Sequence, residues 1–77
     1  MIRVLKISGY YFGKDKFNND QYTVDGLVFD TPANYVGNPS KRIWVKADKV
    51  QLDPNSIGKT LFAEYNERGN IVKCEVK

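Results

Sequence analysis

The stretch Lys41-Arg42-Ile43-Trp44-Val45-Lys46 decides the fold, because its side chains alternate in character with a period of two. Successive side chains of a β-strand point to opposite faces, so this period predicts a strand. Ile43 and Val45 share the face that would pack on a core. Arg42, Trp44 and Lys46 share the other face, and a row of cation, ring and cation suits a solvent-facing surface that binds a polyanion. An ordinary solvated sheet with a covered tryptophan is the alternative.

Two further strands are predicted before this stretch. Residues 2–7 interleave apolar side chains with cations, and Ser8-Gly9 then breaks the pattern. Residues 21–29 form the second strand, in which the apolar parity slips at Gly26. A bulge at Gly26 would admit one extra residue and reconcile the two halves of this strand.

The clearest hairpin closes the chain. Residues 60–66 and 71–76 alternate apolar and polar side chains, and the turn between them contains Gly69, which suits a positive-φ position. The alternation places Val72, Cys74 and Val76 on the inner face of the last strand.

Three connections complete the chain. The polar segment 13–20 predicts a hairpin turn that carries Lys14, Lys16 and Phe17. The segment 30–40 is dense in Pro, Asn and Gly and predicts a long loop. The segment 47–59 is the one window for a short helix or a turn, and its expected anchors on the core are Val50, Leu52 and Ile57.

Five strands with turn signals at short spacing predict an all-β fold. We expect one domain, residues 1–77, built as a small five-stranded antiparallel barrel or strongly curved sheet. A chain of this size buries only about 60% of the surface that its unfolded form exposes, so the core is modest. Large aromatic side chains would help to fill it. We expect Phe12, Phe29 and Tyr65 inside, with Tyr35 and Trp44 accessible.

The composition leaves little for catalysis or metal binding. The chain has no histidine and one cysteine, Cys74, which excludes histidine-activated nucleophiles and leaves too few ligands for a zinc site. Gly58-Lys59-Thr60 imitates the end of a P-loop, but Asp53 stands where that motif needs a glycine. We therefore expect no enzyme, no cofactor and no metal. Without an apolar run of about 18 residues or a signal peptide, we expect no membrane insertion and a cytoplasmic location.

Aromatic residues interleaved with cations are the remaining signal. The net charge of +3 favours anionic partners. Bases stack on aromatic rings at about 1 to 3 kcal/mol each whatever their identity, and Lys or Arg neutralise the phosphates between them. The sequence therefore predicts a non-catalytic, sequence-tolerant binding protein for single-stranded nucleic acid. The expected contacts are Lys14, Lys16, Tyr35, Lys41, Arg42, Trp44 and Lys46, with the cations on phosphates and the two rings on bases.

The strand pattern also resembles a known family. The opening Met1-Ile2-Arg3-Val4, the strand Ile43-Trp44-Val45-Lys46 and the closing hairpin resemble the small single-stranded-DNA-binding proteins of filamentous phages and their relatives on mobile elements. This resemblance implies an OB-like barrel, DNA rather than RNA as the ligand, and a homodimer that coats the strand cooperatively. The loop at 30–40 and the shorter closing turn depart from the family pattern.

A second interpretation belongs to another functional class. The same small domain could be a protein-interaction or assembly module, in which Phe62, Tyr35 and Val36 form an apolar contact and the cations only keep the protein soluble. A stable oligomer that is indifferent to an oligonucleotide would favour this interpretation.

Overall fold

Five strands make up most of the regular structure in the described part of this chain. The computed structural model describes residues 1–29 and 31–77. The strands are β1 (Ile2–Lys14), β2 (Asp20–Val28), β3 (Ser40–Lys46), β4 (Thr60–Tyr65) and β5 (Ile71–Val76), and the 3-10 helix η1 (Pro54–Ser56) precedes β4. The predicted all-β class is confirmed. Among the residues described, no helix has the length and apolar character needed to cross a membrane.

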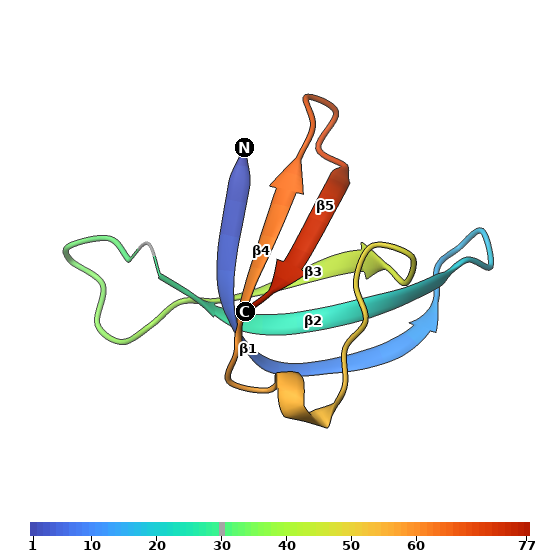
Figure 1. Ribbon diagram of the computed structural model, residues 1–77. Coiled ribbons are helices and arrows are strands. Elements are labelled where there is room, and N and C mark those ends of the chain that lie inside the picture. Colours follow the sequence, from blue (N-terminus) through green and yellow to red (C-terminus); the bar gives the residue numbers. More distant parts are fainter. Residues whose placement is uncertain (30) are drawn as a thin grey trace.

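The strands form one open sheet in the order β3-β2-β1-β4-β5 (Figure 1). Every neighbouring pair is antiparallel. Closure into a barrel needs the first and last strands of this order to pair. In the part of the chain that the structure describes, β3 and β5 do not pair and the sheet is not strongly curled. The predicted barrel or strongly curved sheet is therefore wrong, and β3 and β5 are two free edges.

A single apolar core lies on one face of this sheet. Ile43 and Val45 point into it, as the period of the stretch 41–46 predicts. Leu52 also belongs to the core and comes from the connection between β3 and β4. That connection covers the core with its own side chains, so the core is buried without pairing β3 with β5. The buried members are Leu5, Ile7, Val24, Ile43, Val45, Leu52, Leu61 and Ala63.

The connection between β3 and β4 contains the expected helical turn. The Asp53 carboxylate accepts a hydrogen bond from the backbone N–H of Asn55 at 2.9 Å, and the backbone N–H of Asp53 donates to the Ser56 hydroxyl at 3.1 Å. This reciprocal capping begins η1. Of the three expected anchors, Val50 and Leu52 pack on the core and Ile57, which follows η1, is exposed.

The strand β1 is shared by both halves of the sheet. Residues 2–6 pair with β4, and residues 5–14 pair with β2. The register with β2 shifts at Ser8, which has no partner there. A bulge of this kind bends a strand, and Figure 1 shows β1 changing direction between its two halves. The Ser8 hydroxyl donates to the carbonyl oxygen of Asp25 at 3.0 Å, which holds the bulge against β2.

The bulge in β1 stands in place of the one predicted at Gly26. The inner face of β2 is continuous, because Tyr22, Val24 and Val28 all pack on the core and Gly26 is buried between them. Phe29 consequently has the outer parity and is more than half exposed, contrary to the prediction. The predicted bulge in β2 is therefore wrong: the extra residue is in its partner strand.

Aromatic burial follows the prediction only in part. Tyr65 packs against the core, whereas Phe12 is more than half exposed near the end of β1. The Phe12 ring meets that of Tyr22 edge to face, with the centroids 5.3 Å apart. Tyr35 and Trp44 are exposed, as predicted.

The predicted closing hairpin is present as β4 and β5. Gly69 in its turn has a φ of 80°, the left-handed region that favours glycine. A second bulge leaves Val72 without a partner in β4. Ile71 therefore packs on the core, whereas Val72 is 45% exposed. Cys74 and Val76 face the core as expected, and the inward placement of Val72 is wrong.

Candidate functional site

Three residues from neighbouring strands lie side by side on the face opposite the core, which we call the outer face. Tyr11 of β1 is opposite Thr23 of β2, and Thr23 is opposite Trp44 of β3. Tyr11 is 57% exposed and Trp44 is 58% exposed, whereas Thr23 is only 4% exposed. Directly opposed side chains on antiparallel strands contact one another, so the two rings flank and cover the threonine. This set, the aromatic row, offers two rings to a ligand.

Arg42 and Lys46 lie on either side of Trp44 on the same strand face, as predicted. Arg42 is opposite Asp25 of β2 and forms a two-point ion pair with it. The guanidinium Nε lies 2.7 Å from one carboxylate oxygen, and Nη2 lies 3.2 Å from the other. Two parallel hydrogen bonds fix the plane of the guanidinium as well as its position.

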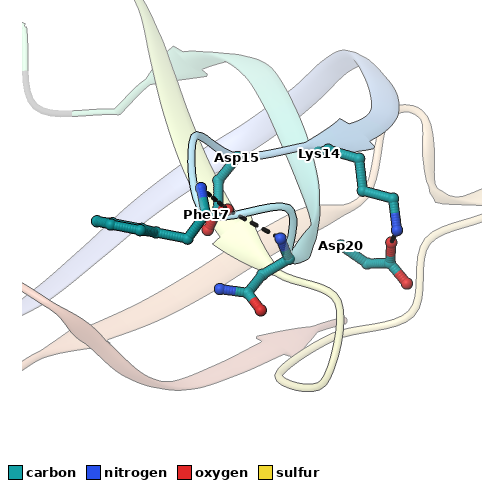
Figure 2. Close-up of polar contacts among 5 residues, drawn as sticks. Lys14, Asp15, Phe17 and Asp20 are labelled. Atoms are coloured by element: carbon teal, nitrogen blue, oxygen red, sulfur yellow. Dashed lines mark hydrogen bonds and ion pairs between the residues drawn. The ribbon is translucent and has the colours of Figure 1, made fainter.

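The turn between β1 and β2 reaches the Lys46 end of the aromatic row. The Asp15 carboxylate accepts hydrogen bonds from the backbone N–H groups of Phe17 at 2.8 Å and Asn19 at 2.9 Å. Figure 2 shows Asp15 and Phe17 in this turn. The Lys46 ammonium also donates to this carboxylate. The Asp15 carboxylate therefore both holds the turn together through backbone hydrogen bonds and neutralises Lys46.

The other two cations of this turn point elsewhere. Lys14 pairs with Asp20 across the base of the hairpin (Figure 2), and its parity in β1 is that of the core-facing Tyr10. The Lys16 ammonium lies 5.2 Å from the ring centroid of Phe17. Neither lysine adds to the outer face beside Trp44.

Ion pairing keeps the outer-face carboxylates charged. The hydrogen bond from Lys46, supported by the backbone N–H of Asn19, holds the pKa of Asp15 far below its ordinary value. The hydrogen bond from Arg42 lowers the pKa of Asp25, and Asp25 in turn raises the pKa of Arg42. At neutral pH each carboxylate stays ionised beside its cation. An incoming phosphate therefore has to compete with a carboxylate for Arg42 and Lys46.

A groove of about 380 Å³ runs between β3 and the β4–β5 hairpin, and we call it the cationic groove. Trp44 lies on its β3 side, and Tyr65 lies on its β4 side. Among the described residues that line it there is no Asp or Glu. Its four cations are Arg3, Lys41, Arg42 and Lys46.

Two of these cations differ from the outer-face pair. Within residues 1–29 and 31–77, Arg3 and Lys41 take part in no ion pair. The Arg3 guanidinium lies over the Tyr65 ring, 5.7 Å from its centroid, which is the geometry of a cation–π contact. Lys41 has the parity of Ile43 and so belongs to the inner side of β3. Of the four groove cations, the two that have no carboxylate partner among the described residues are thus Arg3 and Lys41.

The structure brings together only some of the predicted contacts. Arg42, Trp44 and Lys46 share the outer face of β3, and Lys41 meets them through the cationic groove. Tyr35 lies in the loop between β2 and β3, of which Asp30 is outside the described residues.

That loop lies at the opposite end of β2 from Lys14 and Lys16. Figure 1 shows it at one end of β2, whereas the β1–β2 turn with Lys14 and Lys16 lies at the other end. Tyr35 therefore does not join these two lysines in one site.

Two residues of the site, Tyr11 and Arg3, are not predicted from the sequence. Tyr11 shares a row with Trp44 because the bulge at Ser8 changes the parity of β1, and the Ser8-Gly9 break is the signal that marks it. Arg3 joins the groove because β1 also pairs with β4, and nothing in its local sequence indicates that pairing.

The chemistry that this arrangement offers is stacking and charge. Among the residues described, no three His, Cys, Asp or Glu side chains gather as metal ligands. Burial raises the pKa of the Cys74 thiol to about 11, so this thiol is protonated at neutral pH.

A scan against protein-family models and searches of curated proteins and solved structures find no match to this chain. The resemblance to phage single-stranded-DNA-binding proteins therefore stays a prediction.

Proposed function

We propose that this chain is a non-catalytic, sequence-tolerant binding protein for single-stranded nucleic acid, with DNA as the expected ligand and a phage or mobile element as the expected source. One observation carries the proposal: the exposed Trp44 ring, in one row with Tyr11, lines a groove in which Arg3 and Lys41 form no ion pair with any described carboxylate. Rings that stack on bases and cations that bind phosphates are the two parts of such a surface.

The exposed rings favour a single strand over a duplex. In a duplex each base is stacked on its neighbours, so its flat face is covered and cannot meet a protein ring. In a single strand the bases can be splayed out and stacked on Trp or Tyr side chains. Two rings on adjacent strands then give stacking surfaces for successive bases.

The charges suggest a path for the strand. Bases on Trp44 would place the adjoining phosphates at the edge of β3, where the cationic groove opens. Arg3 and Lys41 gain a partner there, whereas Arg42 and Lys46 exchange a carboxylate for a phosphate. We therefore infer that Arg3 and Lys41 contribute more to affinity than the sequence alone predicts.

The strand order supports an open OB-like arrangement as part of this proposal. A long, bent β1 pairs with both β2 and β4, and the aromatic row spans β1, β2 and β3. OB-folds are partly open five-stranded barrels that bind oligonucleotides on strands 2 and 3 with the β1–β2 and β4–β5 loops. The site here shares β2, β3 and the β4–β5 turn with that arrangement and adds Tyr11 and Arg3 of β1, although β3 does not pair with β5.

The test is a titration with oligo-dT followed by the fluorescence of Trp44, the one tryptophan of the chain, at several salt concentrations. We expect quenching and a binding constant that falls with salt at a log–log slope of about −0.7 for each phosphate neutralised. Combining Arg3→Ala with Lys41→Ala should make this slope shallower by about 1.4, since two contacts are lost.

The matched control combines Lys49→Ala with Lys59→Ala, which removes the same charge from exposed lysines outside the groove. This control should keep the wild-type slope. An unchanged Trp44 spectrum, with no retardation of the oligonucleotide in a gel, would contradict the proposed function. Quenching with equal slopes for the two double variants would instead reject the path through the groove.

Removal of the competing carboxylate should strengthen binding. Asp25→Asn leaves the outer face of β2 sterically unchanged but frees Arg42 from its ion pair. We expect about three- to tenfold tighter binding of oligo-dT and a salt slope steeper by up to about 0.7, because Arg42 becomes fully available to a phosphate.

Asp48→Asn is the control for this change, because it raises the net charge equally at an exposed carboxylate in the turn after β3. Equal gains in the two variants would show that net charge, rather than release of Arg42, determines affinity.

An assembly module remains the second candidate function. Val36 is 97% exposed beside Tyr35, which is 50% exposed, in the β2–β3 loop, so the two adjacent side chains offer a small apolar contact to a partner. Phe62 lies on β4, with the Lys77 ammonium 5.6 Å from its ring centroid. A stable oligomer in gel filtration that oligo-dT leaves unchanged would favour this function.

A further inference from the structure

The strand β5 is a free sheet edge whose sequence is complementary to itself. Its central residues read Val72-Lys73-Cys74-Glu75-Val76. When two copies run antiparallel about Cys74, valine faces valine and Lys73 faces Glu75. From this symmetry we propose that β5 pairs with β5 of a second copy of this chain, so that two sheets join across a twofold axis at Cys74.

The backbone geometry of β5 permits this pairing. Thr60 and Lys77 exchange two backbone hydrogen bonds, at 3.0 and 2.9 Å. The backbone N–H and C=O groups of successive residues point to alternate sides of a strand, so those of Lys73 and Glu75 also point toward β4. The N–H and C=O groups of Cys74 and Val76 point to the free edge. In the proposed register Cys74 is opposite Cys74 of the copy, so free N–H and C=O groups of one chain face those of the other.

The charges select this register among its neighbours. A shift of two residues places either Lys73 opposite Lys73 of the copy or Glu75 opposite Glu75. Like charges directly opposite one another destabilise a sheet, and opposite charges stabilise it. Lys73 and Glu75 already pair within one chain at 3.2 Å on the outer face. Two copies would join these into a four-charge cluster of alternating sign.

The surface of β5 is open to such a partner. In the described part of the chain no strand pairs with its outer edge. The Lys73 side chain is 65% exposed, and Val72 is also exposed. On the inner side of the sheet the two copies of Cys74 would meet at the twofold axis, so the new pair has a less polar side as well as a charged one.

The opposite edge of the sheet does not accept its own copy. Val28 donates to the carbonyl oxygen of Pro39, and Ala47 donates to that of Asp20. By the same alternation, the outward backbone groups of β3 belong to Arg42, Trp44 and Lys46. Pairing two copies about Trp44 would place Arg42 opposite Lys46 of the copy. The like charges protect this edge, and association should stop at a closed dimer.

Charge reversal tests the proposal without nucleic acid, so its outcome is independent of the proposed function. Sedimentation velocity over about 10 μM to 1 mM covers the weak association that a short edge contact gives. In a dimer of the Lys73→Glu variant, two pairs of glutamates face each other across the contact. In a dimer of the Glu75→Lys variant, two pairs of lysines do. Each variant alone should raise the dimer Kd by about tenfold or more.

An equimolar mixture of the two variants is the decisive sample. In a mixed dimer two glutamates face two lysines, so the Kd should return to within about threefold of the wild-type value. A change of folding within one chain cannot produce this recovery. Lys49→Glu and Asp48→Lys, at exposed positions in the turn after β3, serve as controls and should dimerise like the wild type.

Three outcomes would overturn the proposal. They are a wild-type chain that stays monomeric over the whole range, single variants that dimerise normally, and a mixture no tighter than its components. If either variant fails to fold, amide hydrogen exchange on the wild-type chain decides. The amides of Cys74 and Val76 should exchange more slowly at high than at low protein concentration, and equal rates would reject the contact.

Discussion

Trp44→Ala is expected to weaken the binding of oligo-dT by about ten- to a hundredfold. Stacking of a base on an aromatic ring contributes about 1 to 3 kcal/mol, and 1.4 kcal/mol corresponds to a factor of ten. The loss should be similar for oligo-dA and oligo-dC, because every base has a flat face to stack. Fluorescence anisotropy of a labelled oligonucleotide measures it, since the variant has no tryptophan.

The salt dependence separates stacking from charge in this variant. Trp44 is uncharged, so its loss should lower affinity at every salt concentration and leave the log–log slope unchanged. Trp44→Phe keeps a ring at this position and should recover a large part of the affinity. Phe29→Ala is the matched control, because it removes an equally exposed ring that lies outside the row and the groove. A loss confined to one base composition would argue against sequence-tolerant stacking.

The local pattern predicts the faces of β3 fully. The period of two in 41–46 assigns Ile43 and Val45 to the core and Arg42, Trp44 and Lys46 to the outer face, and the structure has them there. A strand paired on one side and free of bulges keeps its parity from end to end. Strand faces can therefore be read from sequence wherever the register is regular.

Bulges are where that reasoning fails. Ser8 in β1 and Val72 in β5 are each an extra residue without a partner, and the parity of the strand changes beyond them. The sequence of either strand does not show which of two partners contains the bulge, because a slip in one strand can be absorbed by the other. Parity alone therefore does not place Tyr11 in the site, and it wrongly places Phe29 and Val72 on the inner face.

Longer-range features depend on pairings that no local pattern encodes. Arg3 lines the groove only because β1 pairs with β4 as well as with β2. Likewise, whether a five-stranded sheet closes depends on how its core is covered, and here Leu52 from the connection after β3 completes that cover. The carboxylates that neutralise Arg42 and Lys46 come from β2 and the β1–β2 turn, so their effect appears only in the folded chain.

Gly26→Ala is expected to destabilise the fold by about 1 to 3 kcal/mol, the typical cost of overpacking. A Cβ at position 26 would lie 2.8 Å from the backbone oxygen of Lys6 and 3.0 Å from the Cβ of Leu5. Both atoms belong to the central strand, which β4 holds from its other side. The clash can be relieved only by moving β1 away from β2 or from the core, because neither atom is the end of a flexible side chain.

Gly13→Ala is the control for this prediction, since it lies in the same pair of strands and a Cβ there meets no atom within 4 Å. Urea unfolding followed by circular dichroism should give Gly26→Ala a clearly lower midpoint than Gly13→Ala. Domains of this kind have only about 5 to 15 kcal/mol of stability in total, so the loss is large. Equal midpoints would mean that β1 and β2 separate at little cost at Gly26. The bulge at Ser8, rather than close contact of the two backbones, would then set the alignment that places Tyr11 beside Trp44.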